Sequence, residues 1–170
     1  MEEKLHGSSA DIIVYTCNNG ILEVLTGVRK HDPWKSCITV PFGGHVKASD
    51  SNVISTACRE VFEETGLIVR PRFFVGIYGP ERYHYSFDGR HALRLEQDRS
   101  SVNHVFAGHI TGGALLKESG EQGELKLIRP IELAGKQMCF DHALALADFL
   151  DAWECGSVLS WRHEALKLIK

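Results

Sequence analysis

The sequence predicts one domain of the mixed α and β class, in which helices cover a β-sheet. Its 170 residues, of which 44% are hydrophobic and 24% are charged, match a single globular core. Short β-rich apolar segments mix along the chain with amphipathic helical patterns. No internal repeat or low-complexity tract divides residues 1–170.

The predicted elements mix the two types from one end of the chain to the other. Two strands joined by the turn signal Asn18-Asn19-Gly20 come first, and two helices come last. Pro71 marks an edge or an irregularity in the strand that contains it. Strands are expected at 11–17, 21–28, 37–44, 68–79, 102–111 and 124–133, and helices at 52–65, 140–153 and 158–169.

Two polar segments are expected to connect these elements. Residues 80–101 contain four arginines and predict either a long hairpin or a mobile loop, which can close as a lid over an anionic substrate. Residues 118–124, ESGEQGE, predict a flexible loop.

Composition argues against several classes of function. A formal net charge of −3 does not suggest a general nucleic-acid binder, although local anion sites stay open. The five scattered cysteines contain no CxxC pair and predict reduced thiols. There is neither a signal-peptide pattern nor an apolar run of roughly 18 residues. We therefore expect a soluble cytoplasmic protein without a membrane partner, and a homodimer stays open.

The helix at 52–65 carries an unusual group of charges. Ser51 or Asn52 can cap its start and Gly66 can close its end. At about 100° per residue, Glu60, Glu63 and Glu64 fall within an arc of roughly 100° that overlaps the apolar face. A purely solvated face would instead lie opposite the core.

These three carboxylates oppose the stability of the helix that carries them. Like charges repel at spacings of three and four residues, and carboxylates near a helix C-terminus oppose its dipole. A partly buried, unpaired carboxylate costs more than either effect. A divalent cation removes all three penalties, and hard oxygen ligands suit Mg²⁺ or Mn²⁺. The alternative is a glutamate-rich surface helix.

The residues before and within this helix favour a metal site over a glutamate-rich surface helix. Residues 43–67, GGHVKASDSNVISTACREVFEETGL, resemble the Nudix box, whose pattern is G, five residues, E, seven residues, then R-E-apolar-x-E-E-x-G-apolar. Eight positions match that pattern: Gly44, Arg59, Glu60, Val61, Glu63, Glu64, Gly66 and Leu67. The sequence departs from the pattern in two ways. Asp50 replaces the first glutamate, and eight residues rather than seven separate Asp50 from Arg59. The loop before the helix can absorb these changes, or they can weaken metal binding.

The resemblance implies a fold and a reaction. The fold is an α/β/α sandwich with a mixed sheet, and Nudix enzymes hydrolyse a nucleoside diphosphate linked to another group. Metal ions would be held by Glu60, Glu63, Glu64 and the backbone carbonyl of Gly44. Arg59 would orient the glutamates, and Asp50 would organise the box.

A general base within hydrogen-bond reach of the attacking water is also required. In many Nudix proteins it lies outside the box. Glu121 is the first candidate because of its place in the glycine-flanked loop, and Glu118 and Glu124 are close rivals. Glu60 or Glu64 can serve instead.

The substrate is less sharply indicated. Residues 74–86, FVGIYGPERYHYS, are loosely similar to the segment after the box in ADP-ribose and nucleotide-sugar hydrolases. ADP-ribose or a related derivative is therefore favoured over nucleoside triphosphates. Arg29 and Arg82 are candidates to meet phosphate, and Trp34 and Tyr78 to stack on a base or ribose, although each is also a plausible structural residue.

Two other classes of protein compete with the enzyme. A non-catalytic nucleotide sensor with a Nudix fold would typically have lost the box glutamates, which are all present here. An interaction module with a merely acidic surface leaves Gly43, Gly44 and Arg59 unexplained.

Overall fold

The computed structural model describes residues 7–78 and 101–154, and the account below concerns these residues. Its strands are β1 (Gly7–Asn18), β2 (Ile21–Arg29), β3 (Ile38–Thr39), β4 (Phe42–His45), β5 (Leu67–Tyr78), β6 (Ser101–Gly113) and β7 (Gln122–Ile128). Its helices are α1 (Val53–Thr65), the 3₁₀ turn η2 (Pro130–Leu133) and α3 (His142–Glu154).

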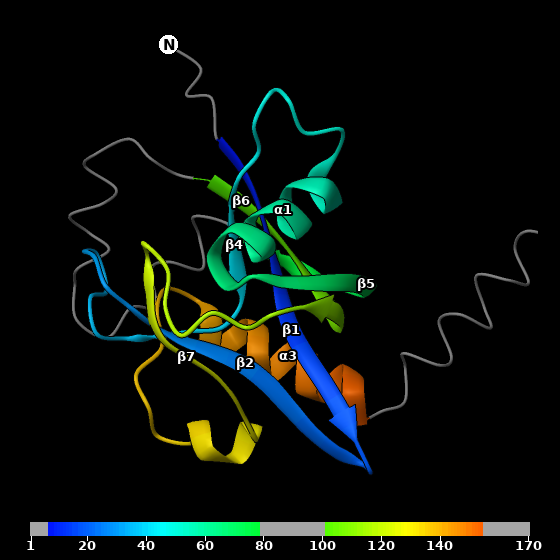
Figure 1. The fold of residues 1–170 in the computed structure, drawn as a ribbon, viewed down its shortest axis with the longest axis vertical. Coiled ribbons are helices and arrows are strands. Elements are labelled where there is room, and N and C mark those ends of the chain that lie inside the picture. Colours follow the sequence, from blue (N-terminus) through cyan, green and yellow to red (C-terminus); the bar gives the residue numbers. More distant parts are fainter. Residues whose placement is uncertain (1–6, 79–100, 155–170) are drawn as a thin grey trace, which may run out of the picture.

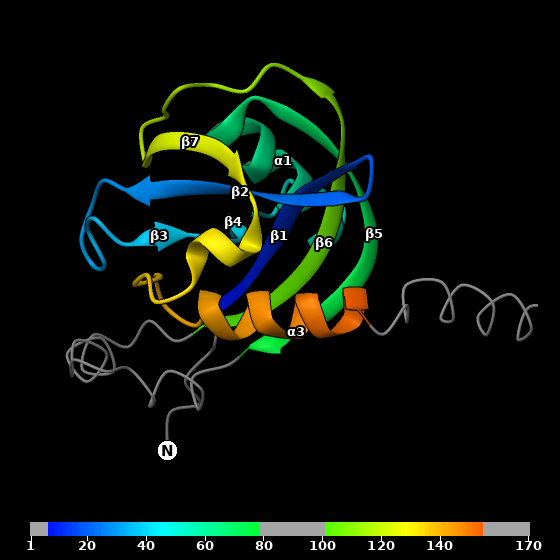
Figure 2. The same cartoon turned by 90° about the horizontal axis from the view of Figure 1, so that it is seen from below.

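The strands form a single mixed sheet. Its main order is β3-β2-β1-β6-β5, while β4 pairs with β1 and β7 pairs with β2. β1 and β6 run parallel, and the other pairs are antiparallel. Figures 1 and 2 show α1 and α3 on opposite faces of this sheet. The predicted sheet with helical cover is therefore confirmed, and so is the mixed sheet that the resemblance implied.

Strand β1 explains why both faces of the sheet are covered. Ala10, Ile12 and Val14 pack in the core beneath α1, whereas Ile13 and Tyr15 pack in the core beneath α3. Successive side chains on a strand point to opposite faces, so an unbroken apolar run needs a partner on each side. This strand therefore lies at the centre of the fold.

Turn and cap residues set the boundaries that lead into the site. The β1–β2 hairpin turns through Asn19 and Gly20, both with positive φ, as the Asn-Gly signal predicted. Helix α1 begins after Asn52, which forms a capping box with Ser55, and ends at Gly66, whose φ is 75°. The helix lies within one residue of the predicted range.

Two strand predictions need correction, and a proline explains each one. The strand expected at 37–44 is split into β3 and β4 on either side of Pro41, which has no N–H to donate to a ladder. The strand expected at 124–133 begins earlier, at Gln122, and ends at Ile128, because Pro130 starts a 3₁₀ turn. The loop expected at 118–124 therefore overlaps the first residues of β7.

Other predictions were met, and some lie outside the described residues. The irregularity expected at Pro71 is a register shift between Pro71 and Phe73. None of the helices in the described ranges is long and apolar enough to cross a membrane. The polar excursion after Tyr78 and the helix expected at 158–169 lie outside the described residues, and one domain over residues 1–170 stays a prediction.

Candidate functional site

A cavity of about 550 Å³ opens beside the C-terminal half of α1. One side of it is formed by residues 43–67, which we call the box wall. The other side is assembled from six separate segments, and we call it the composite wall; its members are Ser9, Asp11, Arg29, Thr39, Pro41, Asn103, Glu121, Gln122, Phe140, Asp141 and His142.

The paired glycines let the box wall pack closely. A Cβ atom on Gly43 would lie 2.2 Å from the carbonyl oxygen of Ala10, and one on Gly44 would lie 2.8 Å from Cδ of Glu60. Both distances are far shorter than van der Waals contact. Larger residues at these positions would therefore push β4 away from β1 or displace the Glu60 carboxylate.

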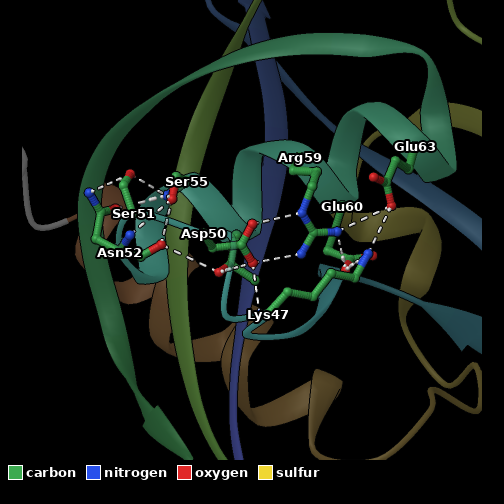
Figure 3. A network of polar contacts seen from close by, with 9 residues as sticks. Lys47, Asp50, Ser51, Asn52, Ser55, Arg59, Glu60 and Glu63 are labelled. Carbon is green, nitrogen blue, oxygen red and sulfur yellow. Dashed lines mark hydrogen bonds and ion pairs between the residues drawn. The ribbon is translucent and has the colours of Figure 1, made fainter.

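Asp50 and Arg59 form the organising contact of the box wall (Figure 3). Arg59 donates from Nε to Oδ1 of Asp50 at 2.9 Å and from Nη2 to Oδ2 at 2.8 Å. The hydroxyl of Thr56 and the backbone N–H of Lys47 also donate to Oδ2. These donors hold the pKa of Asp50 well below its usual range, and the bond to Asp50 raises the pKa of Arg59.

Cations accompany the first two glutamates of the box helix. Arg59 Nη1 lies 2.5 Å from Oε1 of Glu60 and 3.2 Å from Oε2 of Glu63. Lys47 Nζ lies 3.8 Å and 3.7 Å from the same two atoms, as Figure 3 shows. Glu60 and Glu63 are thus held side by side by cationic side chains.

Glu64 has a different environment. Its side chain is buried, at 8% exposure, and Oε2 has no hydrogen-bond partner. Burial raises the pKa of Glu64 to about 8, the charges of Glu121 and Asp11 add to the rise, and a hydrogen bond with Gln122 opposes it. A buried carboxylate oxygen without a partner is unfavourable unless a ligand or a rearrangement provides one.

The three loop acids that are candidates for the general base differ in whether they reach the cavity. Glu121 lines the cavity, with Oε2 lying 3.8 Å from Nη1 of Arg29. Glu118 is instead paired with Lys30 at 2.8 Å, and neither Glu118 nor Glu124 is among the lining residues. Geometry therefore favours Glu121 among the described loop acids.

Arg29 reaches the cavity as the sequence suggested. Its Nε donates to the carbonyl oxygen of Pro33 at 2.8 Å, and its guanidinium carbon lies 5.4 Å from the centre of the Phe140 ring. These contacts fix the guanidinium on the side of the cavity opposite the glutamates. It is thereby placed to meet an anionic ligand.

Two other substrate candidates lie elsewhere, and these expectations need correction. Trp34 is only 4% exposed and belongs to a small core cluster with Cys37 and Cys139. Tyr78 is fully buried, and its hydroxyl donates to Oδ2 of Asp148 on α3. Both aromatic rings complete the core, which is what tertiary packing requires of a large apolar side chain. Arg82 lies outside the described residues.

The sequence reading missed several buried polar residues of the composite wall. Asn103 donates to Oδ2 of Asp11 at 2.7 Å, and burial raises the pKa of Asp11 to about 7. His142 Nδ1 accepts from the backbone N–H of Val40, and burial lowers the pKa of His142 to about 3, which keeps the ring neutral. Asp11 was detectable in principle, because it is an acid at the start of a strand that is otherwise apolar.

The donor set fits a hard divalent cation. Glu60, Glu63, Glu64 and Gly44 line one wall of the cavity, and Glu64 has a carboxylate oxygen that no other group uses. No group of three or more acids, histidines or cysteines within the described residues is already gathered around one point. Arg59 and Lys47 contact two of the carboxylates instead, so the set must rearrange to bind metal.

The fold and the site define a domain with a carboxylate-lined cavity on a mixed sheet. A family model described as the NUDIX domain matches residues 5–151. The chain is 30% identical over 144 residues to an ADP-ribose pyrophosphatase from Methanocaldococcus jannaschii, covering 81% of this chain and 73% of that protein. The chain therefore belongs to the Nudix family.

Solved structures agree on the fold. The NUDIX domain of Shewanella oneidensis NrtR, complexed with ADP ribose, aligns with a TM-score of 0.65 and 16% identity, over 88% of this chain and 90% of that one. A bifunctional NMN adenylyltransferase/ADP ribose pyrophosphatase from Francisella tularensis, complexed with AMP and a manganese ion, aligns with a TM-score of 0.63 and 18% identity. The alignment covers 87% of this chain and 42% of that one. The prediction of a Nudix-type pyrophosphohydrolase is thus confirmed at the level of the family, whose hydrolases are generally dependent on divalent metals.

Proposed function

We propose that this Nudix pyrophosphohydrolase cleaves the pyrophosphate bond of ADP-ribose or a closely related nucleoside-diphosphate derivative, with Mg²⁺ or Mn²⁺ as cofactor. The observation that carries the metal-dependent chemistry is Glu64, a largely buried carboxylate with one unpartnered oxygen that lines the same cavity as Glu60, Glu63 and Gly44. The relative from Methanocaldococcus jannaschii, named as an ADP-ribose pyrophosphatase, supports the substrate class.

Each residue of the box wall has a role in this proposal. Glu60, Glu63, Glu64 and the Gly44 carbonyl would hold the metal, which when bound neutralises phosphate charge and lowers the pKa of water. Arg59, anchored on Asp50, keeps Glu60 and Glu63 on the same side of the helix. Its planar fork of donors suits it to bridge several carboxylates.

The composite wall supplies the remaining groups. Arg29 binds a phosphate of the substrate from the side opposite the glutamates. Glu121 accepts the proton of a water molecule as the water oxygen bonds to one phosphorus and the bridging P–O bond breaks. The electron pair of that bond leaves with the departing phosphate. Glu64 is the alternative base, because it lines the same cavity and, once ionised, its raised pKa makes it a stronger proton acceptor than an ordinary glutamate.

The decisive test is turnover across a panel of substrates with Mg²⁺ or Mn²⁺. The panel contains ADP-ribose, nucleotide sugars, dinucleoside polyphosphates, coenzyme A and nucleoside triphosphates, and products are separated after incubation. We expect metal-dependent cleavage of ADP-ribose, abolished in Glu63→Gln and retained in Glu118→Gln, because Glu118 lies outside the cavity lining. Preferred cleavage of nucleoside triphosphates would replace the substrate class and leave the reaction intact.

A nucleotide sensor remains the second candidate, because Asp50 and the extra residue alter the box. Binding of metal and nucleotide without turnover of any substrate would favour it. A cytoplasmic location and a homodimer also remain predictions; gel filtration of the full chain would decide the latter.

A further inference from the structure

A second cavity, of about 370 Å³, lies on the α3 side of the sheet. Residues of β1, β5, β6 and the last turn of α3 line it, and none of them lines the first cavity. Figure 2 shows this end of α3 beside β5 and β6. Its volume is within the range typical of pockets for small ligands.

The cavity is positively charged. Arg70 and Arg72 of β5 and His109 of β6 all line it. Within the described residues, no carboxylate forms an ion pair with either guanidinium. Arg70 and Arg72 have no acidic partner in the part of the chain that the structure describes, and they line one hollow, so together they attract an anion.

The irregularity at Pro71 puts these arginines there. The β5–β6 register pairs Arg70 with His109 and Phe73 with Ala107, so Arg72 is the extra residue of a bulge. Arg72 lines the cavity together with Tyr15 and lowers the pKa of that phenol against the effect of burial, while the next residue, Phe73, stacks on Phe149 of α3 at 5.9 Å. Consecutive residues therefore both lie on the α3 side, which regular alternation would not allow.

Aromatic rings form another part of the cavity. Tyr15 and Trp153 both line it, and their ring centres lie 5.2 Å apart in an edge-to-face arrangement. The ring of Tyr15 also contacts His109 at 5.6 Å. Aromatic walls favour a ligand that carries a flat ring.

We propose that this cavity is a second binding site, for a small anion that carries an aromatic ring, such as a nucleoside monophosphate. Arg70 and Arg72 bind the oxygens of the anionic group, and the ring of the ligand packs against Trp153 and Tyr15. The site is separate from the carboxylate-lined cavity and does not depend on hydrolysis.

A purely structural role for the arginines makes a different prediction. The last turn of α3 contains no basic residue, so guanidinium groups near its C-terminus can complement the helix dipole. In that case, charge removal would lower stability, and no ligand would bind at the cavity.

The test is a titration of the metal-free, ¹⁵N-labelled full chain, followed by two-dimensional NMR. AMP, adenosine and inorganic phosphate are the probes, and EDTA removes divalent metal. We expect AMP to shift the amide signals of residues 15–17, 70, 72 and 109–111 saturably. Adenosine and phosphate alone should need at least about tenfold higher concentrations, because each offers only half of the contacts.

Variants complete the test. The double variant Arg70→Gln/Arg72→Gln should lose these AMP-dependent shifts and keep the hydrolytic activity of the wild type. The matched control is Arg129→Gln, which removes an exposed arginine elsewhere and should change nothing. The proposal is overturned if AMP shifts no signal at these residues, if the shifts survive in the double variant, or if phosphate alone reproduces them at the same concentration.

Discussion

The two walls of the main cavity are organised in different ways. The box wall is one continuous segment, and its side chains are fixed by contacts between near neighbours, such as Asp50 with Arg59. The composite wall gathers residues from six segments, with Asp11 and Asn103 separated by 92 positions. One wall thus carries its own positioning network, whereas the other exists only after the sheet has formed.

The acids of the cavity also fall into two groups, although these groups do not follow the two walls. Glu60 and Glu63 are near cations, and Asp50 is fully hydrogen-bonded to donors. Glu64 and Asp11, which face the interior, have raised pKa values because of burial. We infer that ionisation of Glu64 and Asp11 is unfavourable in the empty cavity, and that ligand binding offsets this penalty.

The largest expected effect comes from Glu64→Gln. Loss of the buried ligand oxygen should lower kcat by at least about 10³-fold, since a bound metal contributes several kcal/mol of transition-state stabilisation. Stability should not fall, because a neutral amide of similar size replaces a side chain whose ionisation is opposed by burial. Steady-state kinetics and urea unfolding measure the two quantities. Unchanged turnover would remove Glu64 from the site.

A second prediction concerns pH and the metal-free protein. The folded-state pKa values of about 8 for Glu64 and about 7 for Asp11 exceed the ordinary values of 4.5 and 3.8. Between these limits the folded state binds more protons than the unfolded state, so the free energy of unfolding should fall as pH rises from about 5 to 8. The expected loss is on the order of a few kcal/mol.

Urea titrations at pH 5, 6.5 and 8 would measure this dependence. The double variant Asp11→Asn/Glu64→Gln should flatten it, and saturating Mn²⁺ should reduce it by binding the folded state. A free energy of unfolding that rises over this range would contradict the assignment of both raised pKa values.

Glu121→Gln tests whether the composite wall supplies the general base. If Glu121 is the base, kcat should fall by about 10²-fold with little change in KM, and the acidic limb of the pH–rate profile should disappear. Glu118→Gln is the control, since Glu118 is paired with Lys30 and does not line the cavity. Equal activity of the two variants would transfer the role to another acid, with Glu64 first.

Asp50→Asn tests the network of the box wall. The bidentate partner of Arg59 loses its charge, so metal affinity should fall by about 10- to 100-fold, as for other residues that orient ligands. The half-saturating concentration of Mn²⁺ in the activity assay measures this. Wild-type affinity would mean that the altered loop does not organise the glutamates.

The smallest effect is expected for Lys47→Met. Lys47 is half-exposed and lies near Glu60 and Glu63, where a divalent cation must compete with it. Removing an exposed cation changes an interaction worth about 0–1 kcal/mol, so metal affinity should rise by up to about fivefold. Lys126→Met, on the exposed side of β7, is the control. Weaker metal binding in Lys47→Met would show that the lysine assists the site.

The sequence by itself determined the parts that depend on local spacing. The caps at Asn52 and Gly66, the arc of glutamates and the hairpin turn at Gly20 all follow from neighbours within a few residues. Helical geometry is the same wherever a helix forms, so the box wall could be predicted without knowing its surroundings.

Only the tertiary structure decided which distant residues meet. Tyr78 and Trp34 were reasonable candidates for substrate contact, yet both fill the core, because a large apolar ring gains most when it is buried. Asp11, Asn103 and His142 come together only through the parallel pairing of β1 with β6 and the return of the chain before α3. Spacing along the chain determines what a helix presents, whereas long-range packing determines what faces it across the cavity.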